Sequence, residues 1–596
     1  MSGPSTDAEV EHDNQSRLAA RRATHDRLER RHVMFSRVRL TLLVVGVLAL
    51  FTARLEVIPF VGILIVVFIG IAAVHAGTIA ERDRAQRAVQ WYERALERVT
   101  HTWIGRGDAG ERFRPNGHPY ADDIDLFGRG SLFELLSTPR TPGGQEMLAA
   151  WLLTPAPPVT VRERQAAVQE LAQRPDLRES LAIVGESATV RGSALRAWTI
   201  TRVTLSGYAI PVMLGLLSAT NITMLITFLW TGQFGLISLA VMMTQLLVAA
   251  VLGPRVRSVT HAIDTPTRDL TVLAGALRVL EPEKFKAAAL QRLSMAIAAT
   301  GRPASIEIAH LDRLASRLEW HHNLIFAIPA ALMMWTTQCA FAIDRWRGRV
   351  GPRVPGWLDA IAEFEALSAL ATFAAEHPAS SYPVFEAEPA HLTATALAHP
   401  LLGKDAVPND IALGNSHPAL LVVSGSNMSG KSTFLRALGV NVVLASAGAP
   451  VRATSFRLSP LEVGAAIRVL DSLQDGRSHF YAEITRLKQV VDLTRRYPAG
   501  VLCLLDEVLS GTNSHDRAHG AGAIFDGLLA SGAIALATTH DLALSQLAEA
   551  RAPHASNVHF ADRYDAGGLA FDYHLRPGPV KTSNALELMR SIGLDV

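Results

Sequence analysis

The feature that most constrains this chain is the stretch 203–253, which contains no Asp, Glu, Lys or Arg. Within it, the apolar runs Leu205–Trp230 and Gly235–Leu252 are joined by the short polar link Thr231-Gly232-Gln233. A helix of roughly 20 apolar residues spans the roughly 30 Å hydrocarbon core of a bilayer. The pattern therefore predicts a transmembrane hairpin over 204–253, with a buried core hairpin as the alternative.

A second pair of apolar runs lies near the N-terminus. Leu40–Ala53 is short and Val57–Ala76 has full length, with the charged residues Arg54 and Glu56 between them. Flanking arginines can extend a short span by placing their charge at the interface. We expect a transmembrane hairpin over 40–76, with a re-entrant hairpin as the alternative.

Arginines are concentrated on one side of the apolar runs. They precede the first and third spans and follow the second and fourth, whereas the links inside each hairpin are nearly uncharged. Because cytoplasmic flanks carry the excess of Lys and Arg, both termini are expected in the cytoplasm, with the hairpins in the cell (inner) membrane. The flanking arginines are Arg17, Arg21, Arg22, Arg27, Arg30, Arg31, Arg37, Arg39, Arg82, Arg84, Arg87, Arg196, Arg202, Arg255 and Arg257.

The sequence pattern changes from Ile411 onwards. Before that point, residues 79–200 alternate helical stretches with Pro and Gly breaks, and residues 254–380 are also helical in pattern. Beyond them, the short apolar strands Ala419–Ser424, Val501–Leu505 and Ile534–Thr538 alternate with helical segments. This alternation predicts an α/β domain with a mostly parallel sheet. The net charge of +2 argues neither for nor against a nucleic-acid partner.

The first of these strands leads into a glycine-rich motif that fits the pattern GxxxxGK[ST]. Its glycines let backbone N–H groups surround phosphate oxygens at a helix N-terminus, which predicts binding of ATP with Mg²⁺. Lys431 is expected to reach the β- and γ-phosphates, and Ser432 to ligate the magnesium ion. The motif residues are Gly425, Ser426, Asn427, Met428, Ser429, Gly430, Lys431, Ser432 and Thr433.

Polar residues follow the other two strands. Asp506 and Glu507 come directly after Val501–Leu505, and Asp506 is expected to hold Mg²⁺ while Glu507 polarises the attacking water. His540, after the last strand, is placed to sense the γ-phosphate. Ser478 is either a helix N-cap or a γ-phosphate contact.

Two further histidines, His515 and His519, have the i,i+4 spacing of a metal site. No third ligand accompanies them, so we interpret them as surface histidines.

A fifth apolar run, Leu324–Ile343, contains Thr336, Thr337 and Gln338. Five spans would place either the basic N-terminus or the ATP site outside, whereas ATP is cytoplasmic. We therefore interpret this run as a buried helix.

Together, these motifs resemble the MutS-type DNA mismatch-repair ATPases, a branch of the ABC ATPases. The LSGGQ-type helix start of transporters is absent from the sequence. The elements that carry the resemblance are, in order, His399-Pro400-Leu-Leu, Val407-Pro-Asn-Asp410, the phosphate loop with Asn427 and Met428, Asp475-Gly-Arg-Ser-His-Phe480 with Glu483, LLDEVLSGTNS ending at Ser514, TTH ending at His540, and Asn557-Val-His559.

The resemblance implies a homodimer through the ATPase domains, in which Ser478 of one subunit completes the site of the other. His479 departs from the family's usual Thr. Upstream, Leu126–Phe133, Thr138–Gly143 and Arg164-Gln165 look like the family's core lever domain. The arrangement is similar to the membrane-spanning MutS-related proteins of bacteria.

The family's mismatch reader is an N-terminal domain with a Phe-x-Glu wedge. An arginine-rich tail and an apolar hairpin occupy that place here.

The expected fold is multidomain: membrane hairpins, a helical lever and a C-terminal ABC-type P-loop ATPase domain. The favoured function is a membrane-anchored ATPase whose ATP-driven dimer closure acts on DNA; the alternative is an ABC-type transporter or membrane-remodelling ATPase. The expected segments are an arginine-rich cytoplasmic tail (1–39), hairpin one (40–76), a lever region (77–203), hairpin two (204–253), the continuation of the lever region (254–395) and the ATPase domain (396–596).

The topology is testable by labelling single cysteines in intact cells. Cysteines at the hairpin tips, 54–56 and 231–233, should react with an impermeant reagent added outside, and cysteines in 79–200 and 254–596 should not. External labelling near Asp344 would contradict the four-span arrangement, because it would make Leu324–Ile343 a fifth span.

Overall fold

A computed structural model describes residues 6–51, 58–184, 192–205, 207–260, 267–298, 301–320, 324–387, 389–468, 479–565 and 568–580. The chain divides into two compact units. Unit 1 comprises residues 1–138, 148–175 and 367–596, and unit 2 comprises 139–147 and 176–366. These units do not follow the six expected segments one by one. Ser478 and the link 54–56 lie outside the described residues.

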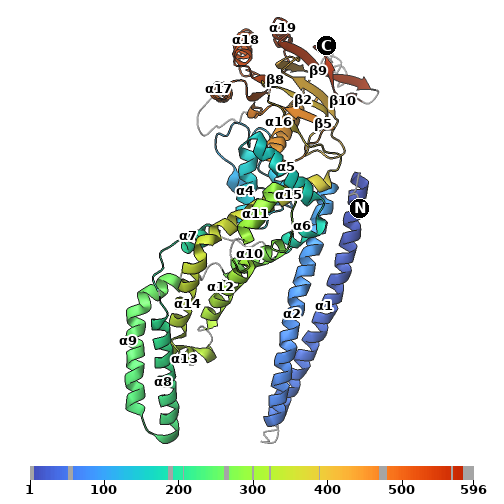
Figure 1. Cartoon of the computed structure of the whole chain (residues 1–596). Helices are drawn as coiled ribbons and strands as arrows, with labels where there is room; N and C mark the ends of the chain where they lie inside the picture. Colours follow the sequence, from blue (N-terminus) through green and yellow to red (C-terminus); the bar gives the residue numbers. More distant parts are fainter. Residues whose placement is uncertain are drawn as a thin grey trace. The chain divides into compact units, whose positions relative to one another are not determined.

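Unit 1 begins with two long helices, α1 (Asp7–Phe51) and α2 (Ile58–Val99), which lie side by side (Figure 1). Helix α1 contains the arginine-rich residues and the first apolar run up to Phe51, and it is continuous through residue 39. No Pro or Gly occurs between residues 6 and 45 to end the helix. The short helices that follow are η2 (Glu111–Phe113), α3 (Leu132–Leu136), α4 (Pro142–Leu153), which both units share, and α5 (Pro158–Ala172).

Unit 2 is helical. Its elements are α6 (Pro175–Ala182), α7 (Gly192–Thr199), α8 (Ala209–Thr231), α9 (Gly235–Thr260), α10 (Thr267–Leu280), α11 (Ala288–Ala298), α12 (Ala304–Glu319), α13 (Leu324–Leu332), α14 (Trp335–Val350), η4 (Gly351–Arg353) and the first part of α15 (Val354–Glu376). Helices α8 and α9 form the hairpin expected over 204–253. Gly232 ends α8 with a left-handed φ of 71°.

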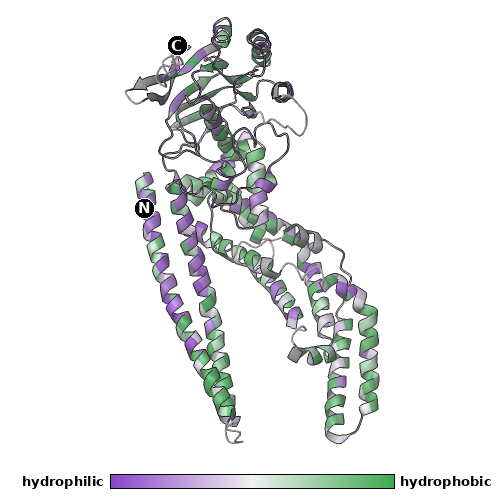
Figure 2. Cartoon of the chain, turned by 180° about the vertical axis from the view of Figure 1, so that it is seen from behind, coloured by the Kyte–Doolittle hydropathy of each residue, from purple (hydrophilic) through white to green (hydrophobic). Residues whose placement is uncertain are grey.

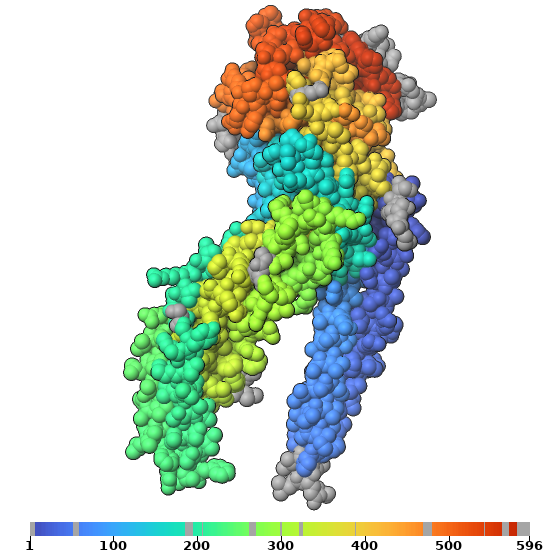
Figure 3. Space-filling model, viewed as in Figure 1, coloured from blue at the N-terminus to red at the C-terminus, as the bar shows by residue number. Residues whose placement is uncertain are grey.

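Among the described residues, four helices are long and apolar enough to cross a membrane: α1, α2, α8 and α9. Their apolar side chains are largely exposed, for example Leu48, Leu229 and Trp230, and Figure 2 shows the apolar ends of both pairs. The space-filling view shows the surface of α8 and α9 in green (Figure 3).

We expected the run Leu324–Ile343 to be one buried helix, and this expectation is wrong. The run is divided between α13 and α14, which are bent by 69° relative to each other. If this bent pair is counted as one span, the number of candidate spans rises from four to five. Met334 lies at the break with a left-handed φ of 49°. The α14 part is mostly buried, whereas Ile328 on α13 is exposed.

Buried polar side chains connect this break to the α8–α9 hairpin. Asn221 Nδ2 donates to Gln245 Oε1 at 2.7 Å, and Ser238 donates to Asn221 Oδ1 at 3.0 Å. Gln245 Nε2 in turn donates to the carbonyl oxygen of Leu332 at 3.1 Å, the last residue of α13. All three side chains are therefore satisfied without water, as buried amides and hydroxyls require.

The rest of unit 1 is an α/β domain, as the alternation of strands and helices predicts. A six-stranded sheet has the order β10-β9-β4-β8-β7-β6. The neighbouring pairs β9–β4, β4–β8, β8–β7 and β7–β6 are all parallel. Strands β4 (Leu420–Ser424), β7 (Val501–Leu505) and β8 (Ile534–Thr539) are buried throughout, which explains their unbroken apolar sequences. The other strands are β6 (Glu462–Ala466), β9 (Ala555–Asp565) and β10 (Gly568–Pro577), the last antiparallel to β9.

A four-stranded sheet, β1-β5-β2-β3, completes the strands of this domain: β1 (Val384–Phe385), β2 (Leu392–Leu397), β3 (Asn409–Leu413) and β5 (Ser455–Leu458). Four helices accompany the sheets: α16 (Lys431–Ala447), α17 (His479–Arg496), α18 (Ser514–Ala530) and α19 (Leu542–Glu549).

Candidate nucleotide-binding site

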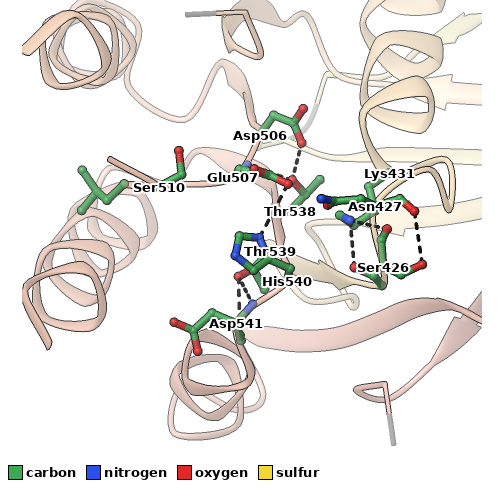
Figure 4. Close-up of polar contacts among 12 residues, drawn as sticks. Ser426, Asn427, Lys431, Asp506, Glu507, Ser510, Thr538, Thr539, His540 and Asp541 are labelled. Carbon is green, nitrogen blue, oxygen red and sulfur yellow. Dashed lines mark hydrogen bonds and ion pairs between the residues drawn. The ribbon is translucent and has the colours of Figure 1, made fainter. Parts of the chain in front are cut away.

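The site lies at the carboxyl ends of β4, β7 and β8. In the sheet register Ser424 pairs with Thr539 and Leu505 pairs with Ala537, so the residues that follow these strands meet at one edge. The phosphate-loop residues follow β4, Asp506 follows β7, and His540 follows β8 (Figure 4). Parallel α/β sheets place their ligands at this edge.

The loop 425–430 has the backbone geometry that its glycines predict. Gly425 and Gly430 have φ values of 153° and 100°. A Cβ on Gly425 would lie 2.7 Å from Ser429 Oγ, so only glycine fits this close approach. Gly430 is the N-cap of α16, whose first residue is Lys431. The helix therefore starts where the motif requires it.

Lys431 is buried, and its ammonium group is held by the loop itself. Its Nζ donates to the carbonyl oxygens of Gly425 at 2.8 Å and Ser426 at 2.7 Å. Burial lowers the pKa of Lys431, and the carboxylates of Glu507, Asp506 and Asp562 partly oppose that shift. This cation is therefore placed beside the acids that follow β7.

Thr538 connects the two acids. Its hydroxyl donates to the Asp506 carboxylate and accepts the backbone N–H of Glu507 at 2.9 Å. Glu507 has a left-handed φ of 47°, and its Oε1 lies 3.6 Å from His540 Nδ1. Sequence reasoning missed Thr538. A hydroxyl residue at the end of an apolar, wholly buried strand was the available signal.

A cavity of about 530 Å³ adjoins the loop and is lined by polar and apolar residues. The polar or charged lining residues Lys431, Ser432, Thr433 and Glu507 are suited to phosphates and Mg²⁺. The other walls, which include Leu397, Leu402, Val407, Phe560 and Tyr573, are mostly apolar and suited to a base. Among the predicted residues Asn427, Met428 and Gly430 also line it.

Two observations test whether ATP and Mg²⁺ fit these residues. Ser429 Oγ is buried in the loop and, within the described part of the chain, has no hydrogen-bond partner. Asp506 and Ser432 supply the hard oxygen ligands that Mg²⁺ prefers. The donor set and the cavity therefore fit a nucleoside triphosphate with its magnesium ion.

Other predicted residues have different surroundings. His515 and His519 are exposed on α18, and among the described residues no group of three or more metal-ligating side chains occurs. Asn557 donates to the Ser545 carbonyl at 2.9 Å, and His559 Nδ1 lies 2.9 Å from Gly578 O. Asn409, from a family-like element, accepts the Leu575 N–H at 2.7 Å and so joins β3 to β10.

The fold and this site define an ATPase-type α/β domain of the P-loop class. A family profile described as MutS domain V matches residues 421–595. Among curated proteins, the chain is 36% identical over 236 residues to "DNA mismatch repair protein MutS 2" of Halobacterium salinarum, covering 38% of this chain and 26% of that one. The C-terminal part of the chain is thus MutS-related, as its motifs indicate.

Two "DNA mismatch repair protein MutS" sequences give similar matches. The protein of Natronomonas pharaonis is 34% identical over 240 residues, covering 39% of this chain and 27% of that one. The protein of Thermus aquaticus is 35% identical over 200 residues, covering 33% and 23%. The chain thus spans about a quarter of the length of the curated relatives it matches.

His399, a buried residue that also lines the cavity, makes folding sensitive to pH. Burial lowers its pKa to about 4, below the ~6.5 of an exposed histidine. As pH falls below 6.5 the unfolded chain binds a proton that the folded chain does not, so the folded state loses stability down to about pH 4. Between pH 7 and 5 the loss is about 2 kcal/mol.

Denaturant unfolding of wild type and His399→Gln at both pH values measures this loss. Gln keeps an acceptor for the Leu401 N–H that His399 Nδ1 binds at 3.1 Å. The variant should lose about 2 kcal/mol less stability than wild type between pH 7 and 5. An identical loss in the two proteins would refute a neutral, buried His399.

Proposed function

We propose that this protein is a membrane-anchored ATPase that binds ATP and Mg²⁺, closes as a homodimer through its ATPase domains and acts on DNA. The observation that carries the proposal is the meeting of Lys431, Asp506 and Glu507 at one sheet edge beside the cavity (Figure 4). The names of the curated relatives support the DNA role.

The chemistry follows from the positions of the side chains. ATP and Mg²⁺ supply the reactive phosphoanhydride and the charge neutralisation at its oxygens. Lys431 would bind the β- and γ-phosphates, while Ser432 and Asp506 would hold the metal ion. Glu507 would accept the proton of the attacking water, and His540, at 3.6 Å from it, would orient that carboxylate or contact the γ-phosphate.

In the proposed dimer, Ser478 completes the site of the opposite subunit. The proposed location is the cell (inner) membrane, with α1, α2, α8 and α9 as spans and both termini in the cytoplasm. Their lengths and exposed apolar side chains support this part of the proposal. A transporter or membrane-remodelling ATPase that does not act on DNA is the alternative outcome of the experiments below.

Substitutions in the site separate binding from hydrolysis. Lys431→Ala should lower ATP turnover by about 100-fold or more, because it removes the cation that neutralises phosphate charge. Glu507→Gln should lower turnover to a similar extent but retain ATP and accumulate a closed dimer. Steady-state turnover, nucleotide binding and sedimentation measure these effects.

The exposed substitutions Lys488→Ala and Glu549→Gln are matched controls and should behave as wild type. Wild-type turnover in Glu507→Gln would refute its role as the general base. An inactive wild-type protein that binds no nucleotide would refute the proposed function as a whole.

The protein should bind DNA with little preference for a mismatch. Arg27, Arg30, Arg31 and Arg37 on α1 and Arg317 on α12 are exposed, and arginines of this kind contact phosphates with salt-sensitive, sequence-blind affinity. Mismatch reading instead needs an apolar wedge that offsets unstacking of a few kcal/mol.

Binding to homoduplex and mismatched DNA at matched salt, across a salt series, measures the preference. We expect affinities within about tenfold, or 1.4 kcal/mol, and a steep loss with salt. A larger preference would contradict the phosphate-binding interpretation, and no binding at low salt would favour the alternative function.

A further inference from the structure

A loop from the region between the apolar hairpins, residues 119–125, lies against three elements of the ATPase domain. The Pro119 carbonyl accepts the N–H of Ala465 in β6 at 2.8 Å. Ile124 is fully buried, and a Cβ on Gly439 of α16 would lie 2.9 Å from it. On its other side, Tyr120 donates to the Leu152 carbonyl at the end of α4 at 2.8 Å.

Asp123 is the centre of these contacts. Its carboxylate is 1% exposed. Oδ1 accepts the N–H groups of Ile467 at 2.7 Å and Arg468 at 2.9 Å, the residues that follow β6. Oδ2 forms an ion pair with Arg486 of α17. One buried carboxylate therefore binds both the end of the edge strand β6 and the helix α17, which follows β6 in the chain.

The same loop also binds the helix that begins at the phosphate loop. Arg436 of α16 donates from Nε to the Asp123 carbonyl at 3.1 Å, and its Nη1 lies 3.5 Å from Asp125 Oδ2. Arg468 contacts Asp125 Oδ1 at 2.8 Å. Asp123 and Asp125 thus connect α16, which starts at Lys431, with the end of β6.

Helix α17 carries the connection on to the catalytic edge. Glu483, three residues before Arg486, is buried, and its carboxylate accepts the N–H groups of Ser510 at 3.2 Å and Gly511 at 3.4 Å. These two residues belong to the loop that directly follows Glu507. Helix α17 thus bonds to Asp123 through Arg486 and, one turn away, to the loop after Glu507 through Glu483.

We propose that Asp123 is a positioning residue for ATP hydrolysis: it holds α17, and through Glu483 the loop after Glu507, in register with the phosphate-loop helix. This inference rests on the proposed ATPase function. Asp123 does not line the nucleotide cavity, so its loss should change the rate of hydrolysis more than the affinity for nucleotide. Misplacing a catalytic group by a small distance is enough to slow a reaction strongly.

Asp123→Asn in the full-length protein tests the proposal. Asn keeps an oxygen for the Ile467 and Arg468 N–H groups but removes the charge that pairs with Arg486. We expect kcat to fall about tenfold, KM and nucleotide affinity to stay within about twofold, and amide exchange at Ser510 and Gly511 to rise about tenfold. Arg486→Gln should give the same pattern, and the double variant should be no worse than Asp123→Asn.

Asp526→Asn is the matched control, because Asp526 of α18 forms a two-contact ion pair with Arg551, which follows α19, and this pair is separate from the contacts of Asp123. It should leave kcat and exchange at Ser510 and Gly511 unchanged. A kcat of Asp123→Asn within twofold of this control would overturn the proposal. So would equal loss of kcat and nucleotide binding in step with loss of folded protein, which marks a purely structural role.

Amide exchange separates this inference from the proposed function, since it needs no hydrolysis. If the wild-type protein does not hydrolyse ATP, the proposed function fails. Increased exchange at Ser510 and Gly511 in Asp123→Asn but not in Asp526→Asn then supports Asp123 as the residue that positions this loop. Unchanged exchange overturns it whatever the wild-type activity.

Discussion

The arrangement of the site in the C-terminal domain depends on the interactions that hold the buried ammonium group of Lys431. A buried cation is costly unless it is hydrogen-bonded and paired, and here two loop carbonyls and nearby carboxylates stabilise it. That environment exists only because β4, β8 and β7 are adjacent and in register, which brings the loop and the acids to one edge. The site therefore requires this order of strands in the sheet.

The parts of this arrangement that follow from local sequence could be predicted. Strand β7 has the expected bounds, Val501–Leu505, because a strand buried on both faces must be apolar throughout and ends where acids begin. The phosphate loop and the start of α16 follow from glycine spacing, and Gly425 and Gly430 adopt the conformations that only glycine adopts readily. The hairpin α8–α9 follows from the length of its uncharged runs.

The rest depends on contacts between residues far apart in the chain. Asp123 and Arg486 are 363 positions apart, and neither stands in a pattern that marks the other as its partner. The sequence marks Thr538 only as the last residue of an expected strand, since its bonds to Asp506 and Glu507 depend on the order of strands in the sheet. The expectation of one helix over Leu324–Ile343 was wrong because hydropathy gives no sign of the break at Met334.

That break bears on how many times the chain crosses the membrane in the proposed arrangement. A 69° bend frees backbone groups, and in hydrocarbon a carbonyl without a donor is unfavourable. Gln245 supplies a donor to Leu332 O, and Asn221 holds Gln245 in place, so the freed carbonyl is satisfied only while α13 lies against the α8–α9 hairpin. A short helix fixed in this way to a neighbouring hairpin is better suited to a re-entrant or buried position than to a straight fifth span. The break therefore favours an even number of spans, with the arginine-rich N-terminus and the ATPase domain on the same side.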